Sequence, residues 1–223
     1  ALQSAIGVGV LVLGTPFLLL LKYDILQVFF FLLPLSILTS LINLIIIRLS
    51  NKNLNVSSYK GLTKFFVVCI PSIIIGLFIL KYFQELINFK LLVSIVTIFS
   101  VLLVLLKDKI KLRINFFRIS ILSIVGVIHG LTNAGGALMS LALSSNSEKN
   151  NARYSITFFY LALATFQYLT TIIIFKNSYF LPQNIYLILV LICGVVLGNV
   201  FIKFLSENNY KLVVNALALT SSF

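Results

Sequence analysis

The residues with the most obvious chemical potential lie in one uncharged stretch, from residue 119 to residue 147. Within it, residues 127–140 read VIHGLTNAGGALMS and include the only histidine of the chain. His129 is titratable, and Thr132 and Asn133 carry hydrogen-bonding side chains. Three glycines, Gly130, Gly135 and Gly136, allow the backbone to come close to a ligand. Since the stretch is long enough to cross a bilayer, these residues predict a broken helix there.

A broken helix inside a membrane can bind an anion. The N-terminal end of a half-helix presents unpaired backbone N–H groups at the positive end of the helix dipole. Asn133 and Thr132 would add side-chain donors. His129 has three open interpretations: a proton acceptor, a charge partner for an anion, or a packing residue. It has no second His or Cys nearby for a metal and no Ser–acid pair for hydrolysis. We therefore expect no metal site, no cofactor and no enzyme chemistry.

A second stretch of the same kind opens the chain. Residues 3–9, QSAIGVG, align with residues 129–135, HGLTNAG, at an offset of 126, which pairs Gln3 with His129. The alignment also places Gly7 on Asn133 and Gly9 on Gly135, with Ser4 beside them. Paired Gly-interrupted segments are typical of a transporter's central site, although small residues also serve close helix packing. Pro16 further predicts a break or kink near residues 12–16.

The alignment divides the chain into two transmembrane repeats, residues 1–112 and residues 113–223. The second span of each half carries polar residues. Ser36, Ser40 and Asn43 share one helical face, and Thr165, Tyr168 and Thr171 share another, with Gln167 nearby. Amides are costly to leave unpaired in lipid, so we interpret Asn43 and Gln167 as facing a hydrated pathway. The hydroxyls are better explained as interhelical hydrogen bonds.

The overall composition is that of an integral membrane protein. Hydrophobic residues make up 60% of the chain and the mean hydropathy is +1.12, far above the range of soluble domains. Uncharged runs predict an all-α protein with seven to eight helical segments in two halves, each opening with a Gly-interrupted segment that is either a span or a re-entrant hairpin. The runs are residues 1–21, 25–47, 65–80, 91–106, 119–147, 154–175, 177–202 and 212–223.

The charges indicate topology. The formal net charge is +12, and the basic residues cluster in the loops at 48–64 and 107–118. The positive-inside rule places these loops in the cytoplasm, for a multi-pass protein of the inner (plasma) membrane, and the charge does not indicate nucleic acid. All five acidic residues lie at segment ends or in loops. The lack of an intramembrane carboxylate argues against a metal-cation carrier and leaves anions and neutral solutes.

The Gly-rich motifs resemble those of the sulfite exporter TauE/SafE family of permeases. SAIGVGVLVLGTPFLLL, at residues 4–20, is similar to the first family motif, and GVIHGLTNAGGALMSLAL, at residues 126–143, is similar to the second. The resemblance implies a secondary carrier of small anions, such as sulfite, organosulfonates or other small organic acids, with the Gly motifs lining the site. The sequence departs from the family pattern at Asn133 and Ala134, and it has no proline soon after Gly136.

Two functions of different classes remain open from the sequence. The first is a small-anion permease, whose expected substrate-binding residues are His129, Gly130, Thr132, Asn133, Gly135, Gly136, Gln3, Ser4, Gly7, Gly9, Asn43 and Gln167. The second is a non-transporting membrane scaffold or assembly subunit, in which the same polar residues only hold helices together. The expected partners are a small anion and the lipid bilayer, and homo-oligomerisation stays open.

Overall fold

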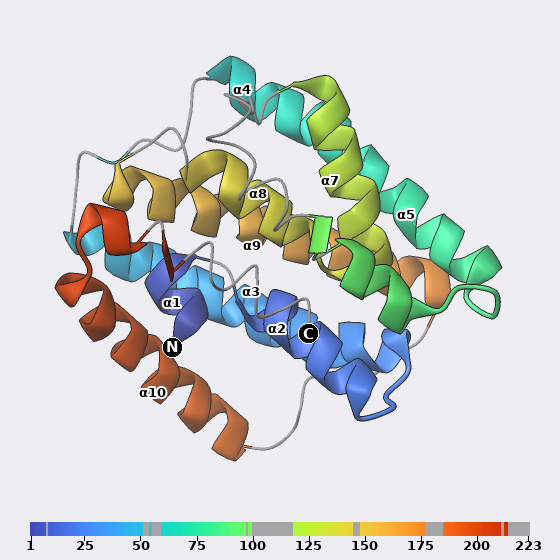
Figure 1. Cartoon of the computed structure of the whole chain (residues 1–223), viewed down its shortest axis with the longest axis horizontal. Helices are drawn as coiled ribbons and strands as arrows, with labels where there is room; N and C mark the ends of the chain where they lie inside the picture. The colour runs from blue at the N-terminus through green and yellow to red at the C-terminus, as the bar shows by residue number, and fades with distance from the viewer. Residues whose placement is uncertain are drawn as a thin grey trace.

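The fold was analysed in a computed structural model, which describes residues 1–7, 9–50, 54, 59–96, 98–99, 118–144, 148–176, 185–210 and 212–213. All regular structure within these ranges is helical (Figure 1). The elements are α1 (Leu2–Ile6), α2 (Val10–Leu20), α3 (Ile25–Ser50), α4 (Tyr59–Lys64), the π-helix η1 (Phe65–Cys69), α5 (Ile70–Phe83), α7 (Ile119–Thr132), α8 (Gly135–Ser144), α9 (Lys149–Phe175), α10 (Ile185–Phe201) and the short 3₁₀ helix η2 (Ile202–Phe204).

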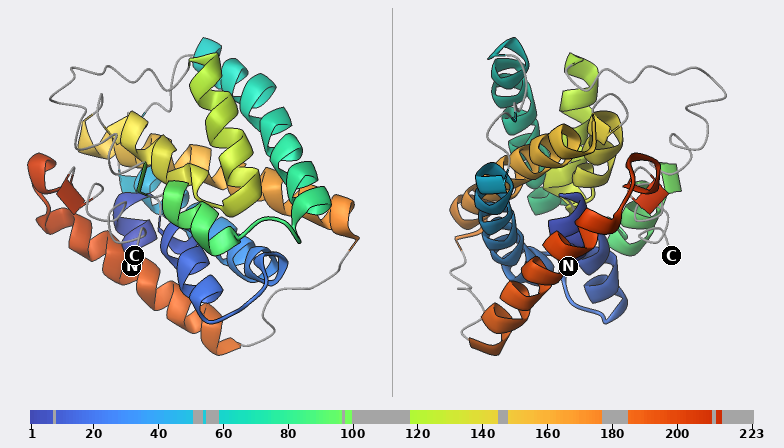
Figure 2. Two further views of the ribbon diagram at one scale, coloured as in Figure 1. Left: turned by 45° about the vertical axis from the view of Figure 1, so that its right-hand side comes forward. Right: turned by 90° about the vertical axis from the view of Figure 1, so that its left-hand side faces the viewer.

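Two long helices, α3 and α9, form the centre of the molecule. They pack side by side and run in opposite directions, so the end of α3 lies beside the start of α9 (Figures 1 and 2). The short helices α1 and α2 lie against α3, α10 packs on α1, and α5 pairs with α7. The buried side chains of these helices form one continuous apolar core. Every short helix near the centre is therefore held by at least one long one.

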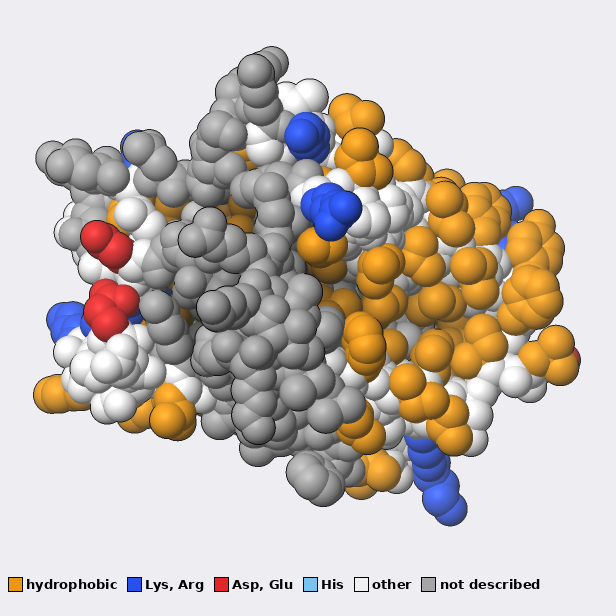
Figure 3. Space-filling view, turned by 45° about the horizontal axis from the view of Figure 1, so that its top comes forward, with side chains coloured by type: hydrophobic (Ala, Val, Ile, Leu, Met, Phe, Trp, Pro, Cys, Tyr) orange, Lys and Arg blue, Asp and Glu red, His pale blue; other side chains and the backbone are white. Residues whose placement is uncertain are grey.

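Within the described residues, four helices are long and apolar enough to cross a membrane. They are Ile25–Ser50, Gly61–Phe83, Lys149–Phe175 and Tyr186–Phe204, and Val10–Leu20 and Ile119–Thr132 are shorter apolar helices. Hydrophobic side chains cover a broad area of the surface in Figure 3. Lipid explains this exposure, because soluble proteins rarely present so large an apolar area. Half of the segment expected at 91–106, nearly all of that at 212–223, and the loop 107–118 apart from Arg118 lie outside the described residues.

Of the break or kink expected near residues 12–16, the break was wrong. Pro16 lies inside α2, which continues from Val10 to Leu20. The interruption lies earlier, where Gly7 adopts φ 101° and ends α1. Proline removes one hydrogen bond and can bend a helix, whereas a left-handed residue changes the direction of the chain. Glycine therefore decides where this segment breaks.

Glycine also sets the close approach of α5 and α7. A Cβ added at Gly130 would lie 2.4 Å from the carbonyl oxygen of Ile73, and one added at Gly76 would lie 2.4 Å from that of Val127. Real Cβ atoms do not come so close, so the two backbones touch only because neither residue has a side chain. This contact explains Gly130 by packing between helices.

Candidate functional site: two sharp helix turns

The first interrupted segment turns sharply between α1 and α2. Gly7 adopts the left-handed conformation and its N–H donates to the carbonyl of Gln3 at 2.8 Å, which ends α1. Gly9 then precedes α2, and a Cβ there would lie 3.0 Å from the backbone nitrogen of Gln3. The chain thus comes back beside α1 before α2 begins. Gly7 also sits against α9, where an added Cβ would meet Ile156 and Thr157 at 2.9 Å.

The second interrupted segment turns between α7 and α8. Asn133 adopts φ 62° and its N–H donates to the carbonyl of His129 at 2.9 Å. A Cβ on Gly135 would lie 2.4 Å from the carbonyl oxygen of Val125 and 2.9 Å from the nitrogen of His129. In one straight helix, residues 125 and 135 would be about 15 Å apart along the axis. The segment is therefore a helix–turn–helix in which α8 packs against α7 (Figure 1).

The two turns share their local geometry, residue by residue, at the same sequence offset of 126. Gly7 and Asn133 both adopt positive φ, and both donate to the carbonyl four residues earlier, on Gln3 and His129 respectively. Gly9 and Gly135 both approach the nitrogen of that same earlier residue. These are the pairs that the sequence alignment places together. The side chains at the two turns differ, however, and so do their hydrogen bonds.

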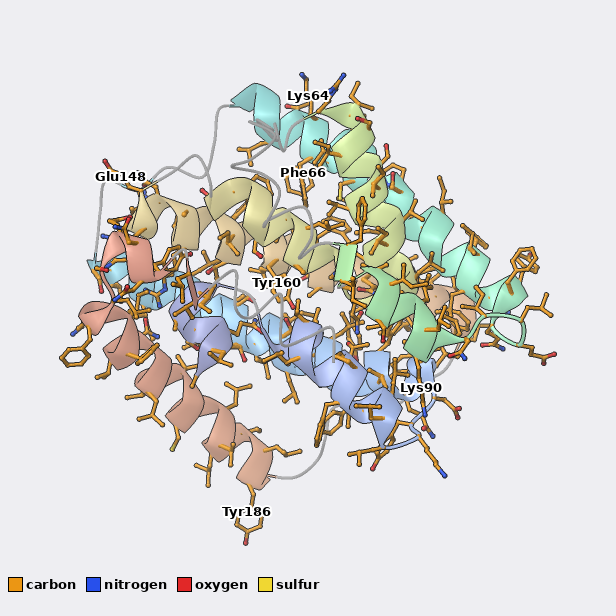
Figure 4. All side chains as sticks on the ribbon, viewed as in Figure 1. Lys64, Phe66, Lys90, Glu148, Tyr160 and Tyr186 are labelled. Carbon is orange, nitrogen blue, oxygen red and sulfur yellow. The ribbon has the colours of Figure 1, made fainter. Side chains whose placement is uncertain are left out.

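Side chains occupy the polar groups of the first turn. Gln3 accepts from the backbone N–H of Val10 at 3.1 Å and donates to Ser36 and Ser40 on α3. The hydroxyl oxygen of Tyr160, on α9, accepts from the N–H of Leu11 at 3.2 Å. The first two N–H groups of α2 are therefore already bonded. Figure 4 shows Tyr160 among the central helices, in contrast to Glu148 and Tyr186 at the periphery.

The polar groups of the second turn are only partly occupied. Asn133 donates through Nδ2 to the Thr15 hydroxyl at 3.1 Å, and Thr132 receives the N–H of Ala134 and donates to Ile128. Asn133 Oδ1 and both ring nitrogens of His129 are buried and have no partner among the described residues. Gly135 and Gly136 are buried too, at the start of α8, where the first N–H groups of a helix have no intrahelical partner. The groups around Gln3 at the first turn are bonded, and the Ser4 hydroxyl is the unpaired side-chain group there among the described residues, whereas this turn leaves an amide oxygen and a whole imidazole unpaired.

Aromatic and hydroxyl groups connect the two turns. The ring of His129 lies 6.2 Å from that of Tyr160, whose hydroxyl is bonded at the first turn. Thr15, which receives the Asn133 amide, belongs to α2 and is buried. The second turn is thus held directly against elements of the first. Gly136 is also buried at this turn.

A buried cluster around Arg153 lies at the other side of the first turn. Arg153 is 6% exposed, and its guanidinium donates to the Ser4 carbonyl through Nε, at 3.0 Å, and through Nη2. Nη2 also donates to the side-chain oxygens of Asn43, at 3.0 Å, and Asn199, at 2.6 Å. Asn43 in turn donates to the Ser4 carbonyl at 3.2 Å. Ser4 and Asn43 are thus brought together, while the Ser4 hydroxyl stays unpaired in the part of the chain described.

The interior face of α9 differs from the face that the sequence suggested. Thr165 and Tyr168 are only partly buried, and Tyr168 packs on Phe30. One buried face of α9, with helical spacing, carries Thr171 and Gln167, which the sequence had singled out, together with Arg153, Thr157 and Tyr160. Gln167 is fully buried, and neither atom of its amide has a partner within the described ranges. Gln167 thus faces the interior of the helix bundle, and the hydrated pathway expected beside it stays a prediction.

Three residues of the site escaped sequence reasoning. Arg153 borders an uncharged run, which made it look like a loop charge at the end of a span. Asn199 lies inside the run 177–202, and the argument applied to Asn43 and Gln167, that amides are costly in lipid, would have found it. Tyr160 reads as an ordinary aromatic residue, and nothing in the sequence marks its hydroxyl as a cap for α2.

The donor set does not fit a metal centre in the described part of the chain, where no three His, Cys, Asp or Glu residues come together. Cys69 is buried and Cys193 is exposed, both as free thiols. The available groups are instead backbone N–H, amide, hydroxyl, imidazole and guanidinium. These groups bind small polar or anionic molecules.

Comparison with known proteins gives the family. A search of curated proteins and a search of solved structures each found no match. The family model for the sulfite exporter TauE/SafE matches residues 1–223, the whole chain. Together with the four long apolar helices in the described part of the chain, this match makes the protein a multi-pass membrane protein of a family of transporters. The chain belongs to the sulfite exporter TauE/SafE family.

Proposed function

We infer that the protein is a secondary permease for a small anion, such as sulfite, an organosulfonate or another small organic acid. The observation that carries this proposal is the second turn, where unpaired buried donors and acceptors meet at the start of a half-helix. Leaving a buried polar group unpaired costs about 1–3 kcal/mol. A bound ligand would supply the missing partners, and the family match supports transport as the reason for such a site.

The anion would bind at the start of α8. The N–H groups of Gly135 and Gly136 supply donors at the positive end of the helix dipole. His129 adds one ring N–H. A neutral imidazole donates through one nitrogen and accepts through the other, so its tautomer decides which nitrogen donates to the anion. Asn133 would reorient from Thr15 to present its Nδ2 group. The oxygen atoms of the anion would thus accept hydrogen bonds from neutral donors, and the turn itself would carry no full positive charge.

Glycine is required at this position for a steric reason. A side chain at Gly135 would collide with Val125, and the left-handed backbone at Asn133 disfavours β-branched and bulky residues. The turn therefore keeps its backbone exposed to a ligand. Gly130 contributes indirectly, because it lets α7 lie close to α5 and so fixes the direction of His129.

The two halves, residues 1–112 and 113–223, would act as related units around this site. The shared geometry of the two turns supports the division, since the left-handed residue and the glycine two positions later recur in both halves at an offset of 126 residues. Alternating access by movement of one unit against the other is the usual mechanism of carriers built in this way. The basic loops, 48–64 and 107–118, would face the cytoplasm of a cell whose inner membrane holds the protein.

The experiment is uptake into proteoliposomes of labelled sulfite, sulfate and a panel of small carboxylates, with and without a pH gradient. Saturable uptake of one anion is the expected result, and it would identify the substrate class. Uptake that rises linearly with concentration would indicate a channel. A flat response to the whole panel, from protein shown to be folded, would favour a membrane scaffold instead.

A further inference from the structure

Arg153 is a buried cation whose partners are all neutral. The guanidinium donates to one carbonyl oxygen, on Ser4, and to two amide oxygens, on Asn43 and Asn199. Among the described residues, no carboxylate pairs with it and its Nη1 nitrogen has no partner. Buried charges are normally paired with an opposite charge, because burial of an unpaired ion is costly. The interior of this protein therefore carries a full positive charge that oxygen dipoles compensate only in part.

The simplest role for Arg153 is that of a cap. Ser4 belongs to the last turn of α1, where carbonyl oxygens lack helical partners, and a cation there also opposes the helix dipole. A neutral donor can perform this task, however. Tyr210 does so beside it, donating to the carbonyl of Ile6 at 3.0 Å. Capping alone thus does not explain why a guanidinium is buried at this position.

The position of Arg153 along α9 suggests a second role. Arg153, Thr157, Tyr160 and Gln167 lie on one buried face, and Tyr160 lies beside His129. Seven residues of helix separate Arg153 from Tyr160, which is about 10 Å. The charge is thus near enough to act on an anion at the second turn. Access from outside the core is also short, because Asn199, its amide partner, is only partly buried.

We propose that Arg153 is the charge-selecting residue of the transport path, which favours anions over neutral solutes and dianions over monoanions. This inference rests on the proposed permease function. The ligand would be an oxyanion that is attracted by the guanidinium, whose Nη1 group is its first contact, and then transferred to the second turn. At an effective dielectric constant of about 20, a unit charge about 12 Å away changes the affinity for a monoanion roughly tenfold. The effect on a dianion is about a hundredfold, because the energy scales with the ligand charge.

The test compares the affinities of a monoanion and a dianion in four variants. Asn199→Asp places a carboxylate where an amide oxygen now accepts from Nη2, so it neutralises the cation and keeps the guanidinium in place. Arg153→Gln removes the charge, and Arg153→Lys retains it. Lys149→Gln is the matched control, since it removes one positive charge from the same helix one turn earlier, at a half-buried site between the exposed residues Glu148 and Asn150, where solvent partly screens it.

Competition of unlabelled acetate and sulfate against the transported anion, in proteoliposomes, gives both affinities. Asn199→Asp and Arg153→Gln are expected to weaken acetate about tenfold and sulfate about a hundredfold. Arg153→Lys should stay within about threefold of the unmodified protein, and Lys149→Gln within about twofold. Thermal unfolding of each purified variant shows whether it is folded, and Asn199→Asp carries the comparison should Arg153→Gln aggregate.

Each outcome is decisive. Equal losses for acetate and sulfate would overturn the proposal, because damage to a structural cap does not depend on ligand charge. Unchanged affinities in Asn199→Asp would overturn it as well. If the unmodified protein shows no saturable anion uptake, the permease function itself fails and this inference fails with it. Normal uptake by the unmodified protein together with an unchanged selectivity would remove only the role of Arg153.

Discussion

The two sharp turns share a backbone geometry and differ in how their polar groups are satisfied. At the first turn, Gln3 bonds to Val10 and to α3, and Tyr160 bonds to Leu11. At the second turn, His129 occupies the position equivalent to Gln3, yet neither of its nitrogens has a partner in the described structure. One turn is thus closed by its own side chains, and the other is left open.

This difference separates a structural role from a binding role. A turn whose donors are occupied contributes to stability and offers nothing to a ligand. A turn with buried unpaired groups costs free energy, about 1–3 kcal/mol for each, and is maintained only where something else gains from it. We therefore propose a supporting role for the first turn and ligand binding for the second. Substitutions at the two turns should therefore differ in their effects on stability and on transport.

The largest effect is expected from Gly135→Ala. The new Cβ would lie 2.4 Å from the carbonyl oxygen of Val125, which is backbone and cannot move aside. We expect a loss of about 3 kcal/mol or more in the free energy of unfolding, at the upper end for overpacking. Gly14→Ala is the control, because its Cβ would meet only the flexible end of Leu32, at 2.9 Å. Denaturation of both variants in detergent would test this, and equal stabilities would contradict the geometry of the second turn.

The next contrast replaces the equivalent residues of the two turns, Gln3 and His129, by leucine. Gln3→Leu leaves the N–H of Val10 unpaired and removes three further contacts to α3, so we expect a loss of about 2–3 kcal/mol in stability. His129→Leu removes two unpaired nitrogens, so its stability should stay the same or rise, while uptake falls at least tenfold. Thermal unfolding and uptake are measured on both. A strongly destabilised His129→Leu would mean that the imidazole is a structural residue.

Asn133→Gly tests the side chain at the second turn without straining its backbone. Glycine adopts positive φ at no steric cost, whereas leucine at φ 62° would be strained and would confuse folding with function. The variant loses the bond to Thr15, about 1 kcal/mol, and we expect the affinity for the anion to fall at least tenfold. Unchanged uptake kinetics in Asn133→Gly would exclude the amide from the site.

The smallest effect is expected from Tyr160→Phe. It removes one hydroxyl that accepts from the Leu11 N–H and retains the buried ring. We expect a loss of about 1 kcal/mol in stability and a change in anion affinity of less than about threefold. Stability and competition assays on the same preparation provide both values. A large loss of affinity with unchanged stability would place Tyr160 in the binding site and weaken the contrast between the turns.

Glycine spacing carried much of what could be predicted from the sequence. The two Gly segments predicted interrupted helices, and the alignment paired Gly7 with Asn133 before their shared left-handed geometry was seen. Left-handed residues are rare outside Gly and Asn, so these letters restrict the backbone directly. The break at Pro16 was wrong because a proline can bend a helix without ending it, whereas a left-handed residue ends it. The buried face of α9 was only partly predicted. The residues around Thr165, Tyr168 and Thr171 are almost all apolar, so no contrast between polar and apolar residues marks which side of the helix is buried.

The Arg153 cluster could not have been derived in the same way. Its four participants, Ser4, Asn43, Arg153 and Asn199, come from four separate helices, and their meeting depends on the packing of α1, α3, α9 and α10. A charged residue beside an apolar run normally marks the end of a span. Tertiary packing overrides that rule here, because α1 packs on α9 and the side chains of Asn43, on α3, and Asn199, on α10, accept from the guanidinium.

The most direct test of the central claim is substrate protection of a cysteine at each turn. In a Cys69→Ala, Cys193→Ser background, Ala134→Cys reports on the second turn and Val10→Cys on the first. A small aqueous thiol reagent is applied with and without the transported anion, and the labelling rate is followed. We predict that the anion slows labelling of Ala134→Cys at least tenfold and leaves Val10→Cys unchanged. Equal protection at both positions, or none at Ala134→Cys, would contradict the assignment of the ligand to the second turn.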